Sequence, residues 1–265
     1  MSVLMQISDT HFGTERPAVV EALVALALQQ RPDLLVLSGD ITQRARQAEF
    51  RAARAFMDRL GAPMLAIPGN HDIPLFNVWA RLQRPYAGHM AAFGSDLEPV
   101  YSSPDLLVVG VNTTRARRHK DGEVSAQQID RVTQILKGAN AAQLRVVVVH
   151  QPVAVTRAED RPNLLHGHAH ALERWAAAGA DLVMGGHIHL PYVLEIKGLA
   201  RAMWAVQAGT AVSSRVRPGA PNSVNLLRWE SGALPRLCLI EQWDFSRNEQ
   251  RFVCAVVTEV KAARD

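Results

Sequence analysis

The chain has 265 residues, of which 48% are hydrophobic and 20% are charged, close to the average of folded globular proteins. This composition excludes a disordered chain, because enough apolar surface is present to form a core. The formal net charge of +4 favours anionic ligands but is too small to predict nucleic-acid binding. Two cysteines exclude a disulfide framework, and we expect Cys238 and Cys254 to be buried free thiols.

The first third of the chain alternates short apolar runs with amphipathic helical patterns. Strands are predicted at 3–7, 34–37 and 64–67, and helices at 17–30 and 45–60. The first helix has an apolar stripe made of Val20, Leu23, Val24, Ala27 and Leu28. Strand and helix alternating in this way are typical of right-handed parallel crossover units in an α/β protein.

The rest of the chain is less regular. Residues 74–105 carry scattered aromatics and are predicted to form a helical excursion, as a lid or cap. Further elements are predicted as strands at 106–111, 145–149 and 181–184 and as helices at 125–136 and 168–178. Five closely spaced strands after residue 190 predict antiparallel hairpins. No linker or repeat divides the chain, so one domain over 1–265 is expected.

Polar side chains follow five of the predicted strands at the point where each strand ends. They are Asp9, His11, Asp40, Asn70, His71, His150, His187 and His189. Ligands of open α/β sheets bind at the carboxyl ends of strands, so we expect these groups to converge on one crevice.

Two carboxylates confined to one small volume repel each other, and a divalent cation removes that cost. The donors are nitrogen and oxygen without thiolate, which suits Mn, Fe or Zn better than a structural cysteine–zinc site. Seven donors exceed the need of one tetrahedral ion and fit two ions that share a carboxylate. Such a pair can clamp a phosphoryl group during in-line displacement.

These residues resemble the motifs of the calcineurin-like metallophosphoesterases. The matching blocks are Asp9-Thr10-His11, Gly39-Asp40, Gly69-Asn70-His71-Asp72, His150 and Gly186-His187-Ile188-His189. The form of the first block and the Gly-Glu-Val-Ser segment at 122–125 are similar to bacterial class III cyclic-nucleotide phosphodiesterases and glycerophosphodiesterase-like enzymes. The resemblance implies a four-layer α/β/β/α sandwich.

The resemblance also implies a role for each residue. One metal ion would be held by Asp9, His11, Asp40 and His189, and the other by Asp40, Asn70, His150 and His187, with Asp40 bridging. His71 would contact the phosphoryl oxygens or protonate the leaving alkoxide. Asp72 would orient His71 by accepting its second ring N–H. Gln151 stands where the family often has a second histidine, a change that keeps the ligand His150 but bears on substrate orientation.

Two further segments have more than one interpretation. His166-Gly167-His168-Ala169-His170 repeats the Gly-His-x-His pattern, but it follows no strand and opens a helix, so we reject it as a metal-binding block. Its histidines line the cleft or are ordinary surface residues. The basic segment from Arg115 to Lys120 is either a solvated loop or a rim that attracts a phosphate, with Arg117 and Arg118 as the test positions.

We therefore expect a dinuclear-metal phosphodiesterase, in which metal-bound hydroxide attacks cyclic nucleotides or small linear diesters. The alternatives are a nuclease, a nucleotide-sugar pyrophosphatase or a phosphomonoesterase, and, more remotely, a non-catalytic scaffold. The expected partner is a small anionic phosphoester and not duplex nucleic acid, and a homodimer is consistent with the resemblance. No stretch is long enough to span a membrane and no secretory signal precedes Ser8, so we expect a cytoplasmic protein.

Overall fold

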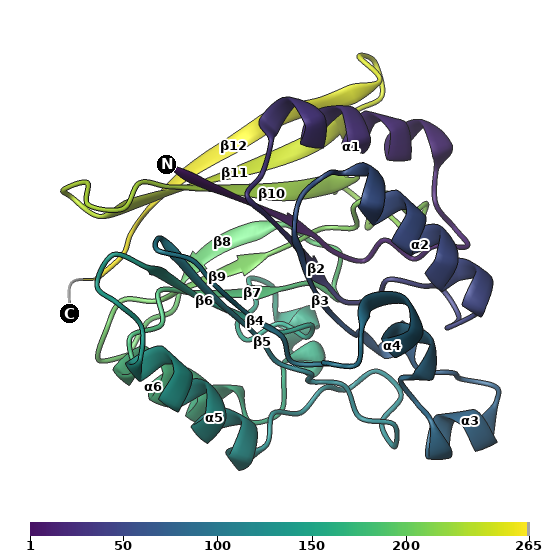
Figure 1. Cartoon of the computed structure of the whole chain (residues 1–265), viewed down its shortest axis with the longest axis horizontal. Coiled ribbons are helices and arrows are strands. Elements are labelled where there is room, and N and C mark those ends of the chain that lie inside the picture. The colour runs from purple at the N-terminus through teal and green to yellow at the C-terminus, as the bar shows by residue number, and fades with distance from the viewer. Residues whose placement is uncertain (264–265) are drawn as a thin grey trace.

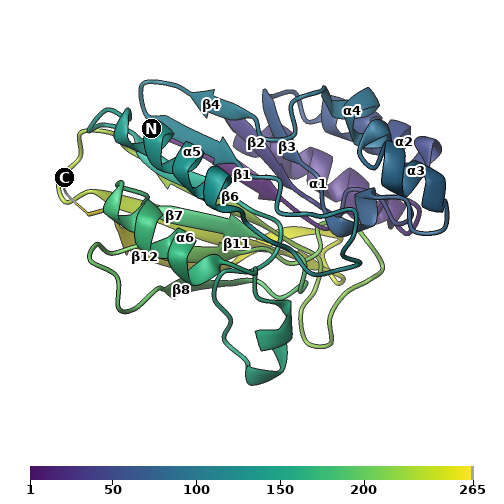
Figure 2. The same cartoon turned by 90° about the horizontal axis from the view of Figure 1, so that it is seen from below.

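The computed structural model describes residues 1–263 and arranges them in four layers, with two six-stranded sheets face to face and helices on both outer sides (Figures 1 and 2). The first sheet has the order β12-β11-β10-β1-β2-β3 and the second has the order β4-β5-β6-β7-β9-β8. The predicted α/β/β/α sandwich is confirmed.

The first sheet contains strands from both ends of the chain: β1 (Ser2–Ile7), β2 (Leu34–Ser38), β3 (Met64–Ile67), β10 (Ser223–Trp229), β11 (Leu237–Ser246) and β12 (Arg251–Lys261). The second is built from the middle: β4 (Val100–Ser102), β5 (Leu106–Gly110), β6 (Leu144–Val148), β7 (Leu182–Gly185), β8 (Tyr192–Glu195) and β9 (Trp204–Gln207). The α-helices are α1 (Pro17–Gln30), α2 (Gln47–Arg59), α3 (Val78–Gln83), α4 (Ala87–Phe93), α5 (Ala126–Lys137) and α6 (His168–Ala177). Two 3₁₀ helices are η1 (Asn70–Asp72) and η2 (Ala158–Asn163).

Alternating residues of the central strands fill three separate cores. In β2, Leu35 and Leu37 face α1 and α2, while Leu34 and Val36 face the second sheet. In β6, Val147 packs toward α5 and α6. Side chains alternate across a strand, so a strand buried on both faces must be apolar at every position. This explains the uninterrupted apolar runs of the sequence.

Helix bounds follow local capping signals. Ser125 caps α5 by accepting from the backbone N–H of Gln128, whose side chain accepts in return from the backbone N–H of Ser125. The prediction for α1 is correct in its bounds, but Leu28 is 57% exposed and does not belong to the inward stripe. The buried face of the helix includes Val19 and Leu26 instead. Leu28 lies beyond Val24 on the helix circumference, on the side that faces solvent.

The prediction that the last five strands form successive antiparallel hairpins is confirmed for β8 with β9, and for β10, β11 and β12, which form an antiparallel meander on the first sheet. It is wrong for the step from β9 to β10, because β9 lies in the second sheet, where it also pairs parallel to β7, and β10 lies in the first. Cys238 is buried, but Cys254 is exposed on β12, an edge strand of its sheet, contrary to expectation.

The segment 74–105 forms α3 and α4, which lie beside α2 (Figure 2), and β4, which pairs with β5 at the edge of the second sheet. Helix α4 is fastened by close packing of Gly88 against Phe50 of α2. Helix α3 has no buried residue. In residues 1–263 no helix is both long and apolar enough to cross a membrane.

Candidate metal centre

The carboxyl ends of strands from both sheets meet at one place. Asp9 and His11 follow β1, Asp40 follows β2, and Asn70 opens the 3₁₀ helix after β3. His150 follows β6 of the second sheet, and His187 and His189 follow β7. The five strands therefore belong to two sheets, and the crevice lies where the carboxyl ends of the strands of both sheets meet. The donors fall into three overlapping groups: Asp9, His11 and His189; His11, Asp40 and His71; and Asp40, His150 and His187.

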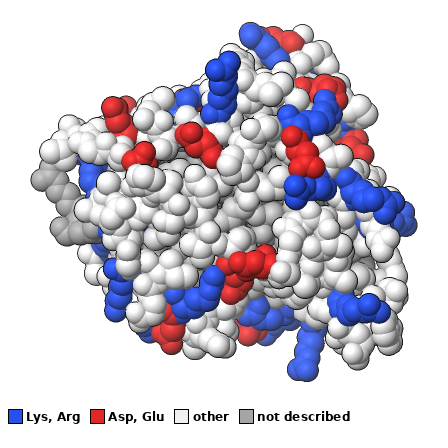
Figure 3. All heavy atoms as spheres, in the orientation of Figure 1, with Lys and Arg blue, Asp and Glu red and all other residues white. Residues whose placement is uncertain are grey.

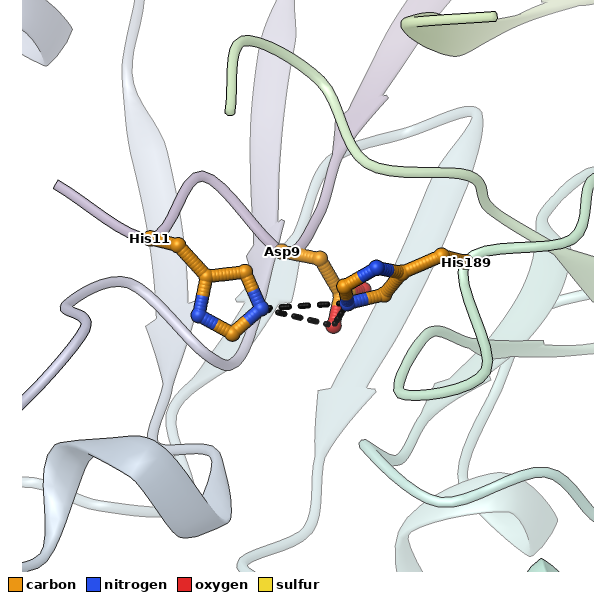
Figure 4. Close-up of side chains that lie close together, drawn as sticks. All are labelled: Asp9, His11 and His189. Carbon is orange, nitrogen blue, oxygen red and sulfur yellow. Dashed lines mark hydrogen bonds and ion pairs between the residues drawn. The ribbon is translucent and has the colours of Figure 1, made fainter. Parts of the chain in front are cut away.

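The first group brings together side chains from the two sheets (Figure 4). Nε2 of His189 lies 3.2 Å from Oδ1 of Asp9, and Nε2 of His11 lies 3.9 Å from the same oxygen. The two Nε2 atoms are 3.0 Å apart. The ring of His189 is held by its Nδ1, which donates to the carbonyl of Arg215 at 2.7 Å, so its second nitrogen points at the acid.

The Asp40 carboxylate lies between this group and the third. Its Oδ1 is 3.2 Å from Nε2 of His150, and its Oδ2 is 3.8 Å from Nε2 of His11. His150 donates from Nδ1 to the carbonyl of Ser38 at 2.9 Å, which turns its other nitrogen toward Asp40. The rings of His150 and His187 stand edge to face with centroids 5.2 Å apart. One carboxylate thus faces two sets of histidines.

His71 is aimed at the same place but is held differently from the prediction. Its Nδ1 donates to the carbonyl of Gln43 at 2.9 Å, and its backbone N–H donates to Oδ1 of Asp40. The prediction that Asp72 accepts from the His71 ring is wrong. Asp72 accepts from the backbone N–H groups of Ile41, Thr42 and Gly69, each within 3.1 Å, and from the Thr42 hydroxyl. It therefore ties the loop after β2 to the loop after β3.

Five of the seven predicted ligands have an unfavourable backbone conformation. The φ angles of Asp9, His11, Asp40, His187 and His189 lie between 41° and 73°. Residues with a Cβ rarely adopt this left-handed region, and such strain collects at functional sites. Close approach adds to the constraint, because a Cβ on Gly186 would lie 2.1 Å from the Ser8 hydroxyl and 2.4 Å from Asp9. The fold therefore holds these side chains in place although their backbone is locally strained.

The electrostatics of the site follow from burial and from the mixture of acids and imidazoles. Burial raises the pKa of Asp9, but the adjacent His189 outweighs it, so the pKa is lowered. Burial lowers the pKa of His11 to about 3 and that of His187 to about 4. Burial also opposes protonation of His150, yet Asp40 raises its pKa to about 9. Burial and then Asp40 raise the pKa of Asp72 to about 6.

The residues present fit one or more metal ions. Among residues 1–263, Asn70 Oδ1, His150 Nε2 and His187 Nδ1 are buried without a hydrogen-bond partner. Buried polar atoms are normally paired, so an orphaned amide oxygen beside orphaned imidazole nitrogens indicates that a group is expected there. The donors are imidazole nitrogen, carboxylate and amide oxygen, which suit Mn, Fe and Zn.

The cleft over these side chains has a volume of 590 Å³ and basic walls. His119 and Lys120 of the basic segment line it, but Arg117 and Arg118 do not. Arg115 is tied to the carbonyl of Asn112, and Arg118 pairs with Glu123 at 3.0 Å. The rim interpretation therefore applies to the end of that segment and not to the two test arginines.

Sequence reasoning missed Arg215, which lines the same cleft. Its Nη1 donates to Oε1 of Gln43 at 2.9 Å and lies 3.4 Å from Nε2 of His71. No carboxylate within residues 1–263 lies within 4.0 Å of its guanidinium, whereas the neighbouring Arg217 is paired with Asp160 and Glu159. The signal in the sequence is its place in the loop after β9, which runs parallel to β7 and ends at the same edge.

Gln151 and the second histidine cluster lie outside the donor set. Gln151 is fully buried, accepts from the Thr113 hydroxyl at 2.6 Å and donates to the carbonyl of Lys120 at 3.2 Å. His168 opens α6 and its Nδ1 donates to the carbonyl of Leu165, while His166 and His170 are exposed. None of these three histidines belongs to a donor group or lines the cleft in the described part of the chain.

A model of the calcineurin-like phosphoesterase family matches residues 2–191, which is more than half of the sequence. This chain belongs to that family. The match covers all five motif blocks, so the resemblance stated from the sequence is confirmed.

Curated relatives and a solved structure agree with this assignment. A probable cyclic nucleotide phosphodiesterase of Synechococcus sp. is 29% identical over 208 residues, which cover 72% of this chain and 74% of the relative. Glycerophosphodiester phosphodiesterase GpdQ of Enterobacter lignolyticus is 37% identical over 81 residues, 26% of this chain and 29% of that protein. A dimetal phosphatase from Danio rerio superposes with a TM-score of 0.69 at 13% identity, covering 99% of each chain, and so shares the fold.

Proposed function

We propose that this phosphoesterase is a dinuclear-metal enzyme that hydrolyses phosphodiesters, either cyclic nucleotides or small linear diesters. The observation that supports it most is the position of Asp40, whose two oxygens face His150 on one side and His11 on the other. A shared carboxylate between two donor sets is the arrangement that two adjacent cations require. The probable cyclic nucleotide phosphodiesterase among the relatives supports a diester substrate.

The proposed ligands of one ion are Asp9, His11, Asp40 and His189, and those of the other are Asp40, Asn70, His150 and His187. When bound, such ions supply a water-derived nucleophile at neutral pH and neutralise charge on the phosphoryl oxygens. The protein fixes the ligands through their second ring nitrogens, since His150 and His189 both donate to backbone carbonyls. Asp72 holds the two loops that carry Asp40 and Asn70.

His71 is the proposed general acid. Its Nδ1 donates to the carbonyl of Gln43, so its Nε2 is left to face the cleft, where the leaving oxygen needs a proton. Arg215 is the proposed contact for a non-bridging phosphoryl oxygen, because its guanidinium lies beside His71 without an acidic partner in residues 1–263. An anionic substrate gives that guanidinium the charged acceptor that the free site lacks.

The experiment compares the wild-type protein with Asp40→Ala and His168→Ala, using bis(p-nitrophenyl) phosphate and added Mn²⁺. We expect Asp40→Ala to lower kcat by roughly three orders of magnitude, because both ions lose their shared ligand. The kcat of His168→Ala should stay within about twofold of the wild type. EDTA should abolish turnover and Mn²⁺ should restore it. Equal effects of the two substitutions, or full turnover by metal-stripped protein, would overturn the proposal.

A further inference from the structure

A second hollow lies beside the metal centre and not within it. It has a volume of 1170 Å³ and runs between α2 and residues 74–92, which form α3 and α4. Phe76 and Trp79 stand on its wall with 74% and 61% of their surface exposed. Exposed aromatic side chains that cluster in a concave surface are typical of a binding site. We call this hollow the α2–α3 groove.

The α2–α3 groove is also strongly basic. Five arginines line it against one acidic residue, Asp58, which pairs with Arg54 at 2.9 Å. Within residues 1–263, Arg44, Arg51 and Arg84 have no carboxylate within 4.0 Å. Figure 3 shows basic side chains along the right of the view, where α2, α3 and α4 lie. The groove thus offers unneutralised positive charge to an anion.

Charge and aromatic surface are combined in the same places. The guanidinium of Arg44 lies 5.3 Å from the centroid of the Phe76 ring, and that of Arg84 lies 5.1 Å from the ring of Trp79. These cation–π contacts hold the rings and leave their opposite faces open. A ligand that matches this wall carries both a flat ring and an anionic group.

A small pocket lies between the groove and the cleft of the metal centre and shares walls with both. Arg44 and Leu75 line the groove and also a small pocket of 60 Å³, whose other walls include Asn70, His71 and His119. These last three residues also line the 590 Å³ cleft. The groove is thus one small pocket away from His71 and from the predicted ligands of the metal ions.

We propose that the α2–α3 groove binds the second arm of a linear nucleotide diester whose scissile phosphate lies at the metal centre. The base would stack on Phe76 and Trp79, because aromatic side chains stack with any base. A further phosphate would pair with Arg51 and Arg84, since guanidinium groups bind phosphate well. This inference rests on the proposed function and narrows it, since a cyclic mononucleotide has no second arm to place in the groove.

Other occupants fit less well. A second copy of the chain whose twofold axis passed through the groove would place these arginines against one another, and like charges would repel. An acidic protein would satisfy the arginines but does not require a path to His71. The pocket that shares walls with both the groove and the cleft favours the substrate itself.

The test uses three p-nitrophenyl esters with the same leaving group: methyl p-nitrophenyl phosphate, thymidine 5′-(p-nitrophenyl phosphate) and its 3′-phosphorylated form. We expect kcat/KM of the Mn²⁺-loaded wild type to rise along this series. Phe76→Ala/Trp79→Ala should lower kcat/KM for the thymidine esters about tenfold and change the methyl ester less than twofold. Arg51→Gln/Arg84→Gln should remove the gain from the 3′-phosphate at low salt.

Leu234→Ala and Arg251→Gln serve as controls, because they are an exposed apolar residue and an exposed arginine outside the groove. They should leave the whole series unchanged. Equal kcat/KM for the three esters in the wild type, or equal losses across the series in the groove variants, would overturn the inference. So would a dimer that dissociates in Phe76→Ala/Trp79→Ala during sedimentation, since a second copy would then cover the groove.

A binding measurement separates this inference from the proposed function. Thymidine 3′,5′-bisphosphate should quench the fluorescence of Trp79 in metal-stripped protein, with no such signal in Trp79→Phe. If the loaded wild type hydrolyses none of the esters, the proposed function fails, and quenching alone then supports the groove as a nucleotide site. Absence of both turnover and quenching overturns the two together.

Discussion

Replacing Gly69 with alanine should push Asp40 out of position. A Cβ at Gly69 would lie 2.0 Å from the amide nitrogen of Asp40 and 2.2 Å from its Oδ1, whereas real Cβ contacts stay beyond 3.0 Å. The φ of Gly69 is −101°, which any residue adopts, so contact and not backbone strain decides the outcome. Asp40 must retreat by about 1 Å, and a metal site tolerates errors of only about 0.2 Å in its ligand distances.

The stability cost of such overpacking is about 1–3 kcal/mol, or a fall in Tm of roughly 3–10 °C. A 1 Å misplacement should also lower turnover of bis(p-nitrophenyl) phosphate about a hundredfold. Metal content after dialysis, Tm in EDTA and kcat/KM measure these effects. Gly138→Ala is the matched control, because its Cβ would meet nothing closer than 3.5 Å. Wild-type metal content and turnover in Gly69→Ala would refute the reasoning.

Three further predictions concern charge. Arg215→Gln should raise KM for an anionic diester about tenfold, as for loss of one charged hydrogen bond, whereas Arg117→Gln should leave KM unchanged; steady-state kinetics at low salt decides. Burial opposes protonation of His150, but Asp40 raises its pKa to about 9, so Nε2 must lose a proton before it can bind a metal ion. The affinity for Mn²⁺ should therefore rise roughly fiftyfold between pH 7 and 9. An affinity that does not change with pH in a chelator competition assay would contradict this. Burial lowers the pKa of His89 to about 4. The unfolded chain therefore binds the proton more readily than the folded chain, so the folded state loses stability as the pH falls below 6.5. Between pH 7.5 and 5.5 in EDTA, the free energy of unfolding, measured by urea titration, should drop about 1 kcal/mol more in the wild type than in His89→Leu.

Most helices and strands of the fold could be predicted from local patterns in the sequence. Helix bounds and apolar strands were predictable because capping residues and side-chain alternation act over a few positions, as Ser125 and the β2 run illustrate. Strand pairing was not predictable in the same way. The parallel pairing of β9 with β7 and the passage of the chain from β9 in the second sheet to β10 in the first depend on contacts that the spacing of strands along the sequence does not reveal.

The candidate site shows the same division. The seven expected ligands come together because each directly follows a strand, which the sequence displays. Side-chain partners are different, since Asp72 sits next to His71 in the chain yet reaches the opposite loop. Arg215 was missed because its loop was assigned to hairpins, and the basic residues of 115–118 were overvalued because their carbonyl and Glu123 partners are invisible in sequence.

Arg215 joins two tasks in one residue. Its carbonyl holds the ring of His189, and its guanidinium reaches the side of the cleft where His71 lies. Any shift of the 208–222 loop therefore changes the position of His189, a proposed metal ligand, and that of the Arg215 guanidinium, the proposed phosphate contact, together. In the proposed enzyme, binding of the metal ions should raise the affinity for substrate, and substrate should in turn raise the affinity for the metal ions by the same factor.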